Sequence, residues 1–361
     1  MKIGIIGTRG IPNNYGGFEQ FAEFVSTILV QKGFEVFVYS SHNHVYQGSS
    51  FNGINIIHCN DPEYKLGTVG QFIYDLNCIR DARKRDFDII LQLGYTSSSV
   101  WHWLMPKKAI VTTNMDGLEW KRTKFSKPVQ KFIKYAEKLA VKYSDHLIAD
   151  SIGIQSYIKG SYNKESTYIP YGATPFDDPD PNCLKEYGLD QYEYNLLIAR
   201  LEPENSIETI LKGHVQSNSA MPIVVIGKTD TPLGQKLKEK YASNANITFL
   251  GGVYDQEKLN NLRYYSNIYF HGHTVGGTNP SLLEAMASNA FICANDNEFN
   301  KSILNKDAVY FGSIESIIPI FNLHKKDYSS FLKNNLSKIK DLYSWELIAS
   351  QYEAHFLDIL K

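Results

Sequence analysis

Cysteine is scarce in this sequence of 361 residues. The four cysteines, Cys59, Cys78, Cys183 and Cys293, stand far apart and show neither pairing nor CxxC spacing. Disulfide scaffolds and thiolate metal sites need paired or closely spaced cysteines. We therefore expect reduced core cysteines, a cytoplasmic location and no metal site.

An excess of charge of one sign is lacking as well. The chain has 37 basic and 38 acidic residues and a net charge of -1, so it has no overall signature of a nucleic-acid-binding protein. Long apolar runs are also missing. The run at 1–7 is too short for a signal peptide, and no later run approaches the roughly 20 apolar residues of a membrane span. Any membrane contact should therefore be made from outside the bilayer.

What the sequence does contain is a repeated alternation of strand and helix patterns. Strand-like apolar runs occur at 3–6, 35–39, 54–58, 89–93, 109–113 and 145–149, and again at 195–199, 223–227, 247–250, 268–271 and 291–294. Helical patterns lie between them. This order predicts an α/β protein with two tandem Rossmann-like domains, each a parallel sheet covered by helices.

A polar, proline-rich stretch at 177–182 separates the two halves. Such stretches are typical of domain boundaries, and the chain is long enough for two domains. We expect an N-terminal domain at 1–175 and a C-terminal domain at 176–342. The final segment, 343–361, predicts an amphipathic helix anchored by Trp345 that crosses back to the first domain.

A glycine-containing loop in the second half has the features of a phosphate site. Asn279 is a good N-cap and Pro280 suits the first helical position, so a helix should begin there. The N–H groups of its first turn would lie behind Gly276 and Gly277 and favour an anion, above all a phosphate. Glu284, one turn further on, would accept hydrogen bonds from the hydroxyls of a sugar. An ordinary βαβ turn with a solvated glutamate explains this local sequence equally well.

Asp116 is the corresponding candidate in the first half. It follows the strand at 109–113, and a carboxylate at the carboxyl end of a parallel strand faces the crevice where open α/β sheets bind ligands. It would position or deprotonate a hydroxyl group. An Asp-Gly turn without a chemical role is the alternative.

A predicted helix from Pro128 carries a row of basic residues. We expect Phe132, Leu139 and Tyr143 on its opposite, apolar side. A basic side of this kind suits anionic lipid headgroups or a phosphorylated acceptor, although many such sides only face solvent. The basic residues are Lys131, Lys134, Lys138 and Lys142.

The first glycine loop allows a dinucleotide-binding alternative. Gly4, Gly7 and Gly10 match the GxGxxG pattern poorly, and the second strand ends in Ser40 and Ser41, where an NAD fold would place an acidic residue. An NAD-dependent oxidoreductase is therefore disfavoured by these residues.

Taken together, the motifs at 16–19, 199–205 and 283–287 resemble those of glycosyltransferase family 4. That family has the GT-B fold, in which two tandem Rossmann-like domains have parallel sheets facing a central cleft. More narrowly, 7–10 with 15–19, 116–122 and 271–281 are similar to its bacterial rhamnosyltransferase-like branch. The resemblance spans nearly the whole chain.

The resemblance implies retaining transfer from a nucleotide sugar that is bound mainly by the C-terminal domain. It also implies an acceptor on the N-terminal domain, no cofactor and no required metal. Arg200 matches the family's diphosphate-binding arginine, and Glu284 matches the ribose-binding glutamate of its E-x7-E motif. Asp116 and Arg200 are the candidate catalytic residues. The other implied donor-binding residues are Gly16, Gly17, His271, Gly276, Gly277, Thr278 and Asn279.

The sequence departs from the family pattern at two positions. The first glutamate of E-x7-E falls on Gly276, and the diphosphate-binding lysine falls on Asn205. Lys228, at the end of the strand at 223–227, is a candidate substitute cation. We interpret Gly276 as a sign of altered sugar recognition.

These inferences predict a transferase that moves L-rhamnose from dTDP-rhamnose to a lipid-linked saccharide acceptor. It would act in bacterial O-antigen or capsule synthesis, in the cytoplasm or peripherally on the inner face of the plasma membrane. A UDP-hexose or UDP-N-acetylhexosamine transferase of the same fold is one alternative. A non-catalytic relic that binds sugar nucleotides or glycans is the alternative of another class.

Overall fold

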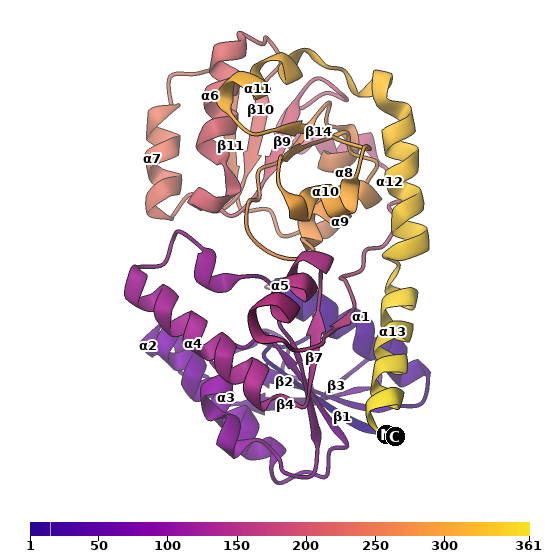
Figure 1. Ribbon diagram of the computed structural model, residues 1–361. Helices are drawn as coiled ribbons and strands as arrows, with labels where there is room; N and C mark the ends of the chain where they lie inside the picture. The colour runs from indigo at the N-terminus through magenta and orange to yellow at the C-terminus, as the bar shows by residue number, and fades with distance from the viewer. Residues whose placement is uncertain (15) are drawn as a thin grey trace. The chain divides into compact units, whose positions relative to one another are not determined.

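The computed structural model describes residues 1–14 and 16–361. Tyr15, part of the 15–19 motif, lies outside the described residues. The chain forms two compact units (Figure 1). Unit 1 comprises Met1–Lys121, Phe125–Tyr171 and Trp345–Lys361, and unit 2 comprises Arg122–Lys124 and Gly172–Ser344.

Unit 1 is built on a sheet with the strand order β3-β4-β2-β1-β5-β6-β7-β8. Neighbouring strands are parallel except β3 and β4, which are antiparallel. The strands are β1 (Lys2–Ile6), β2 (Glu35–Ser41), β3 (Ser50–Phe51), β4 (Ile54–Cys59), β5 (Ile89–Leu93), β6 (Ile110–Asn114), β7 (His146–Ala149) and β8 (Thr167–Tyr168).

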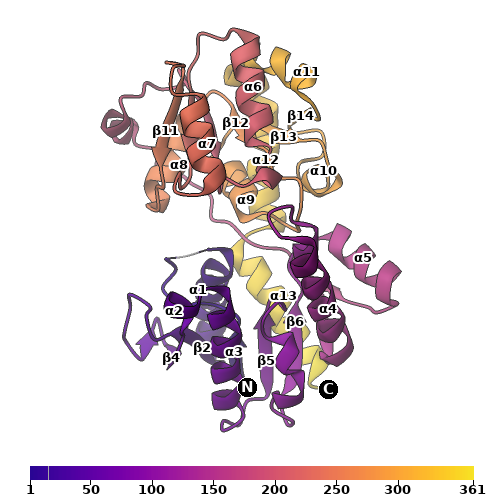
Figure 2. The ribbon, with the colours of Figure 1, turned by 90° about the vertical axis from the view of Figure 1, so that its left-hand side faces the viewer.

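In the described residues of unit 1, helices from the first half and from the end of the chain accompany this sheet (Figure 2). They are α1 (Gly17–Gln31), α2 (Glu63–Leu66), α3 (Thr68–Ala82), α4 (Lys127–Tyr143), α5 (Ile152–Tyr162) and α13 (Trp345–Ile359). The short helix α2 lies against α3.

The C-terminal helix α13 lies beside α1 (Figure 1). The rings of Phe24 and Trp345 stack with their centroids 4.9 Å apart, and Phe21 packs on Tyr352 at the same centroid distance. Phe21, Trp345 and Tyr352 are buried, and burying a large apolar side chain contributes roughly 1.5–3 kcal/mol. The end of the chain is therefore part of the core of unit 1.

Unit 2 contains a second sheet, with the strand order β11-β10-β9-β12-β13-β14 and parallel pairing throughout the described strands. The strands are β9 (Asn195–Ile198), β10 (Ile223–Ile226), β11 (Ile247–Gly251), β12 (Tyr269–His271), β13 (Ile292–Asn295) and β14 (Val309–Phe311). The helices are α6 (Ile207–Ser217), α7 (Pro232–Lys240), α8 (Gln256–Tyr265), α9 (Pro280–Ala287), α10 (Glu298–Leu304), α11 (Ile314–Ile317) and α12 (Ser329–Leu342).

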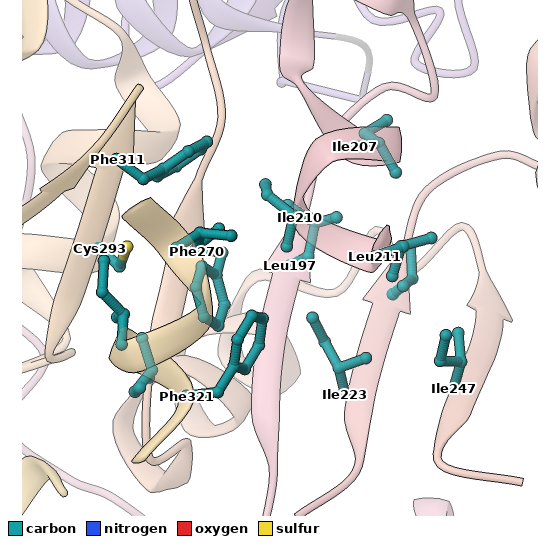
Figure 3. Close-up of a cluster of buried hydrophobic side chains, with 14 of the residues drawn as sticks. Leu197, Ile207, Ile210, Leu211, Ile223, Ile247, Phe270, Cys293, Phe311 and Phe321 are labelled. Atoms are coloured by element: carbon teal, nitrogen blue, oxygen red, sulfur yellow. The ribbon is translucent and has the colours of Figure 1, made fainter. Parts of the chain in front are cut away.

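The core of unit 2 forms where apolar strand residues meet the apolar faces of covering helices. Figure 3 shows Leu197 of β9 and Ile223 of β10 facing Ile210 and Leu211 of α6, with all four side chains buried. Parallel strands covered by helices read as continuous apolar runs, which is why the sequence pattern was clear here.

The face by which α4 packs differs from the sequence prediction. The predicted apolar side was wrong, because Phe132 and Tyr143 are 39% and 45% exposed. The helix instead buries Ile133, Ala136, Ala140 and Val141, together with Glu137. Among the lysines, Lys134 turns inward to Glu137, whereas the other three are exposed. No helix in the described part of the chain is long and apolar enough to cross a membrane.

Candidate functional site

The strand order reverses direction once in each sheet, and open α/β sheets bind ligands beside that point. In unit 2 the chain runs from β9 through β10 to β11 on one side, and then from β12 through β13 to β14 on the other. The reversal lies between β9 and β12, which are followed by Arg200, Asn205 and the loop at 272–279. In unit 1 the corresponding point lies between β1 and β5.

The loops after β9 and β12 are joined by close backbone contacts. Thr274 donates both its N–H and its hydroxyl group to the carbonyl oxygen of Glu204, at 3.0 and 2.9 Å. A Cβ on Gly272 would lie 2.0 Å from the carbonyl oxygen of Asn205, so only glycine permits this approach. We call these two joined loops, 199–206 and 272–279, the β9/β12 rim.

Asn205 connects Arg200 with His273 inside the rim. Its Nδ2 donates to the Arg200 carbonyl oxygen at 2.8 Å, and its Oδ1 lies 2.8 Å from Nδ1 of His273. The other end of the imidazole faces Gly276, where a Cβ would lie 2.9 Å from Nε2. The structure thus brings Arg200, Asn205 and Gly276 together around a histidine that the sequence analysis did not single out.

Three cationic side chains gather at the rim. The segment Arg122–Lys124 belongs to unit 2, and Nη1 of Arg122 lies 4.0 Å from Oε1 of the buried Glu204. Burial, and then the charges of Arg200 and Arg122, lower the pKa of Lys124, although Glu202 and Glu204 act in the opposite direction. Cations that oppose one another's protonation create a field that favours an anion. This rim is therefore suited to a phosphate or a diphosphate.

His273 of the rim and His271, the last residue of β12, both have lowered pKa values. Burial lowers the pKa of His271 to about 3, with His273 and Arg263 adding to the effect. Burial, followed by the charges of Arg122 and Arg200, lowers the pKa of His273 to about 4, although the Val275 carbonyl acts in the opposite direction. Neither ring adds positive charge to the rim, so each offers hydrogen bonding instead.

Helix α9 begins as the sequence predicts. Asn279 is its N-cap and accepts a hydrogen bond from the backbone N–H of Ser281 at 2.9 Å, with Pro280 at the first helical position. In the next turn, Oε2 of Glu284 lies 2.6 Å from Nη2 of Arg263, a residue of α8 that is fully buried. A charge-assisted contact of this length orients the carboxylate.

The remaining predicted residues of unit 2 lie at the same edge of the sheet. Gly277 and Thr278 precede the α9 cap, and Thr278 is buried. Lys228 follows β10. The loops after β10 and β9 run side by side, as shown by Gly227, where a Cβ would lie 2.1 Å from the carbonyl oxygen of Ala199. Nζ of Lys228 lies 5.8 Å from the ring centroid of Tyr254.

Gly16, Gly17 and Asp116 belong to unit 1 instead. Gly16 and Gly17 start α1, where the buried Glu19 accepts a hydrogen bond from the Arg9 backbone N–H at 2.7 Å. Asp116 follows β6 with a φ of 50°, and its N–H donates to Oδ1 of Asn114 at 3.0 Å. Both predictions, donor binding by the glycines and acceptor chemistry at Asp116, stay predictions.

Sequence reasoning missed His273, Arg122, Lys124 and Arg263. His273 and Arg122 lie within the motifs at 271–281 and 116–122, so their position next to other candidate residues was the available signal. Arg263 gave none, because its contact with Glu284 depends on how α8 and α9 pack. No cluster of three or more His, Cys, Asp or Glu side chains suited to a metal ion occurs in residues 1–14 and 16–361.

Comparisons with known proteins agree on the architecture. A family model described as a domain of unknown function (DUF1972) matches residues 1–174. No curated protein sequence matches the chain. Among solved structures, a sucrose-phosphate synthase from Thermosynechococcus elongatus has a TM-score of 0.79 at 15% identity, covering 99% of this chain and 98% of that one.

Two further structures align over almost their full length. HepE from Anabaena, in complex with UDP-glucose, has a TM-score of 0.77 at 14% identity, covering 99% of this chain and 100% of that one. A glycosyltransferase from Rickettsia africae has a TM-score of 0.77 at 14% identity, with coverage of 100% and 98%. The chain has the GT-B fold. The predicted fold class is thereby confirmed, and the β9/β12 rim lies in the second Rossmann-like half of that fold.

Proposed function

We propose that the protein is a retaining glycosyltransferase that uses a nucleotide-sugar donor and a saccharide acceptor. The observation that carries this proposal is the cationic β9/β12 rim beside the N-terminus of α9. Arg122, Lys124 and Arg200 supply positive charge there, and Asn279 ends a loop whose backbone N–H groups favour an anion. A nucleoside diphosphate matches this combination of charge and hydrogen-bond donors.

The same groups would stabilise the negative charge on the departing nucleoside diphosphate. In a loose transition state of glycosyl transfer, this charge develops on the leaving group. Arg200 has the central role, with Lys228 as a further cation at the neighbouring loop. Glu284, oriented by Arg263, would hold the ribose. Asp116 would orient or deprotonate the acceptor hydroxyl. No step requires a metal ion.

For the donor we propose dTDP-L-rhamnose, on the basis of the motif resemblance. The acceptor would be a lipid-linked saccharide in O-antigen or capsule synthesis, reached from the cytoplasmic face of the membrane. A UDP-hexose is the second candidate donor, because the structurally similar HepE was crystallised with UDP-glucose.

The first test is thermal stabilisation of the purified protein by dTDP, UDP, GDP and NAD at millimolar concentration. A ligand at 100 times its dissociation constant adds about 2.7 kcal/mol to the stability of the state it binds. The largest shift with dTDP supports the rhamnose donor, and the largest with UDP replaces it by a UDP-sugar. A shift with NAD alone would contradict the transferase proposal.

The second test is turnover. Arg200→Ala should lower kcat by roughly 100-fold or more, as loss of a group that stabilises transition-state charge does. Its Tm should change little, because the side chain lies at an open rim. If Arg200→Ala keeps a near-normal kcat, Arg200 has no role in catalysis. Nucleotide binding by the wild type without any transfer or hydrolysis would favour the non-catalytic relic.

A further inference from the structure

Asn205 and Gly276 lie far apart in the sequence, but one side chain joins them in space. Nδ1 of His273 is 2.8 Å from Oδ1 of Asn205, and Nε2 of the same ring stands 2.9 Å from the position of a Cβ on Gly276. Gly276 also has a φ of 143°, which disfavours other residues. A larger residue at 276 would be strained by this φ and would also require the imidazole to shift, so the glycine allows the present position of the histidine.

The hydrogen bonds around Asn205 define the ring's tautomer. The Arg200 carbonyl oxygen can only accept, so the amide nitrogen of Asn205 faces it and the amide oxygen faces His273. Nδ1 must then carry the proton that this oxygen accepts. In the neutral ring, Nε2 is left as a hydrogen-bond acceptor on the Gly276 side.

We infer that Asn205 and His273 work as a pair in the donor site, Asn205 as the positioning residue and Nε2 of His273 as an uncharged acceptor for a hydroxyl group of the donor sugar. This inference rests on the proposed function. Nε2 lies 2.9 Å from the position of a Cβ on Gly276, so the imidazole fills the space into which a side chain at 276 would extend. A site built this way suits a sugar that needs an acceptor but no negative charge.

The charges around His273 fit this role. Arg122 and Arg200 face the ring, as does the neutral His271, whose ring centroid is 6.0 Å away. Burial, and then these guanidinium groups, lower the pKa of the ring, although the Val275 carbonyl acts in the opposite direction. A carboxylate at the same place would instead pair with the guanidinium groups and compete with the phosphates for them.

The experiment measures two quantities for each variant: the Kd of dTDP or UDP, whichever the wild type binds, and kcat and KM for the matching dTDP-rhamnose or UDP-glucose. His273→Ala and His273→Asn should lower kcat/KM by roughly ten- to a hundred-fold, the effect of losing one buried hydrogen bond. The Kd of the bare nucleotide should stay within about two-fold. His273→Gln, whose amide reaches the Nε2 position, should recover part of the activity.

Asn205 is tested through the pH profile. Asn205→Asp keeps the acceptor for Nδ1 but adds a negative charge that favours the imidazolium, which cannot accept at Nε2. The acid limb of kcat/KM should therefore move up by about one pH unit or more. A purely structural role for Asn205 would lower Tm without moving this limb.

His214→Asn is the matched control. His214 is another buried histidine of unit 2, but its Nε2 binds the carbonyl oxygen of Met221, ahead of β10 and away from the rim. It should lose stability and keep its kinetics. If His273→Ala keeps the wild-type kcat/KM, or if it weakens binding of the bare nucleotide as much as it lowers kcat/KM, this inference is wrong but the proposed function still stands. A wild type that turns over neither nucleotide sugar overturns the proposed function as well.

Discussion

At the scale of single residues, Asp75 of α3 is a buried carboxyl group at the reversal point of unit 1. It accepts a hydrogen bond from Oγ of Ser97 at 2.6 Å. Burial nevertheless raises its pKa to about 6, with Asp61 and Glu63 adding to this effect and Ser97 and Arg9 opposing it. The folded protein therefore binds a proton here that the unfolded chain releases near pH 3.8.

This raised pKa predicts the effect of Asp75→Asn. Stability from the protonated carboxyl group is present below about pH 4 and is lost as the pH rises through about 6. The variant mimics the protonated form, so its advantage over the wild type should grow between pH 4 and pH 7. A pKa difference of about two units corresponds to about 3 kcal/mol.

The measurement is denaturant unfolding of both proteins at pH 4.5 and pH 7. Asp86→Asn is the matched control, because the Asp86 side chain is 94% exposed. It should show no such pH-dependent difference. An Asp75→Asn variant that is equally destabilised at both pH values would mean that Asp75 is ionised in the fold.

Local chemistry decided which residues could be predicted from the sequence. The cap at Asn279 depends on its neighbours Pro280 and Ser281, so it was predicted correctly. The role of His273 depends on Asn205, 68 positions away, and that of Arg263 on Glu284, 21 positions away. Such contacts are set by which strands lie side by side, which periodicity does not encode.

At the scale of elements, α4 shows the same limit. Most strands were predicted because buried parallel strands are largely apolar, but the short strands β3, β8 and β14 were missed. A helix has several faces, any of which can be buried. The apolar residues of α4 lie on more than one side, and the structure buries the side that carries Ile133 and Ala140. Phe132 and Tyr135 are left 39% and 55% exposed beside Lys131 and Lys138.

This exposed face carries the prediction about membranes. Aromatic side chains next to lysines favour binding to anionic lipid, at about 1 kcal/mol for each lysine near the surface. The double variant Lys131→Glu, Lys138→Glu should therefore lower binding to vesicles containing phosphatidylglycerol by at least ten-fold, measured by sedimentation.

Lys333→Glu with Lys340→Glu is the control, since both lysines are exposed on α12 with the same spacing of seven residues. It should bind as the wild type does. Wild-type binding that is the same for neutral and anionic vesicles would contradict the electrostatic part of the prediction. If the wild type binds neither kind of vesicle, the proposal that the protein acts at a membrane surface is wrong.

At the scale of the whole molecule, the buried titratable groups are unequally divided between the two units. In unit 2, burial lowers the pKa of His271 to about 3 and of His273 to about 4, and it lowers that of His214 as well. In unit 1, burial lowers the pKa of His355 to about 4, but it raises those of Asp75 and Glu19. The two kinds of shift have opposite consequences in acid.

A histidine with a lowered pKa stabilises the fold above the unfolded value of 6.5, and this stability is lost as the pH falls toward its folded value. A carboxyl group with a raised pKa acts the other way, because protonation relieves its burial. Between pH 6.5 and pH 4, unit 2 loses stability through three histidines, whereas in unit 1 Asp75 and Glu19 counteract His355. Unit 2 should therefore unfold at a higher pH than unit 1.

Hydrogen exchange followed by mass spectrometry, corrected for the intrinsic effect of pH, can resolve the two units. On acidification from pH 7 to pH 4.5, peptides from β9 and β12 should lose protection before those from β1 and β5. Asp75→Asn should keep this order, because it mimics the protonated carboxyl group and leaves unit 1 at least as stable as in the wild type across this pH range. Earlier opening of unit 1, or simultaneous opening of both, would show that the buried histidines do not govern acid stability.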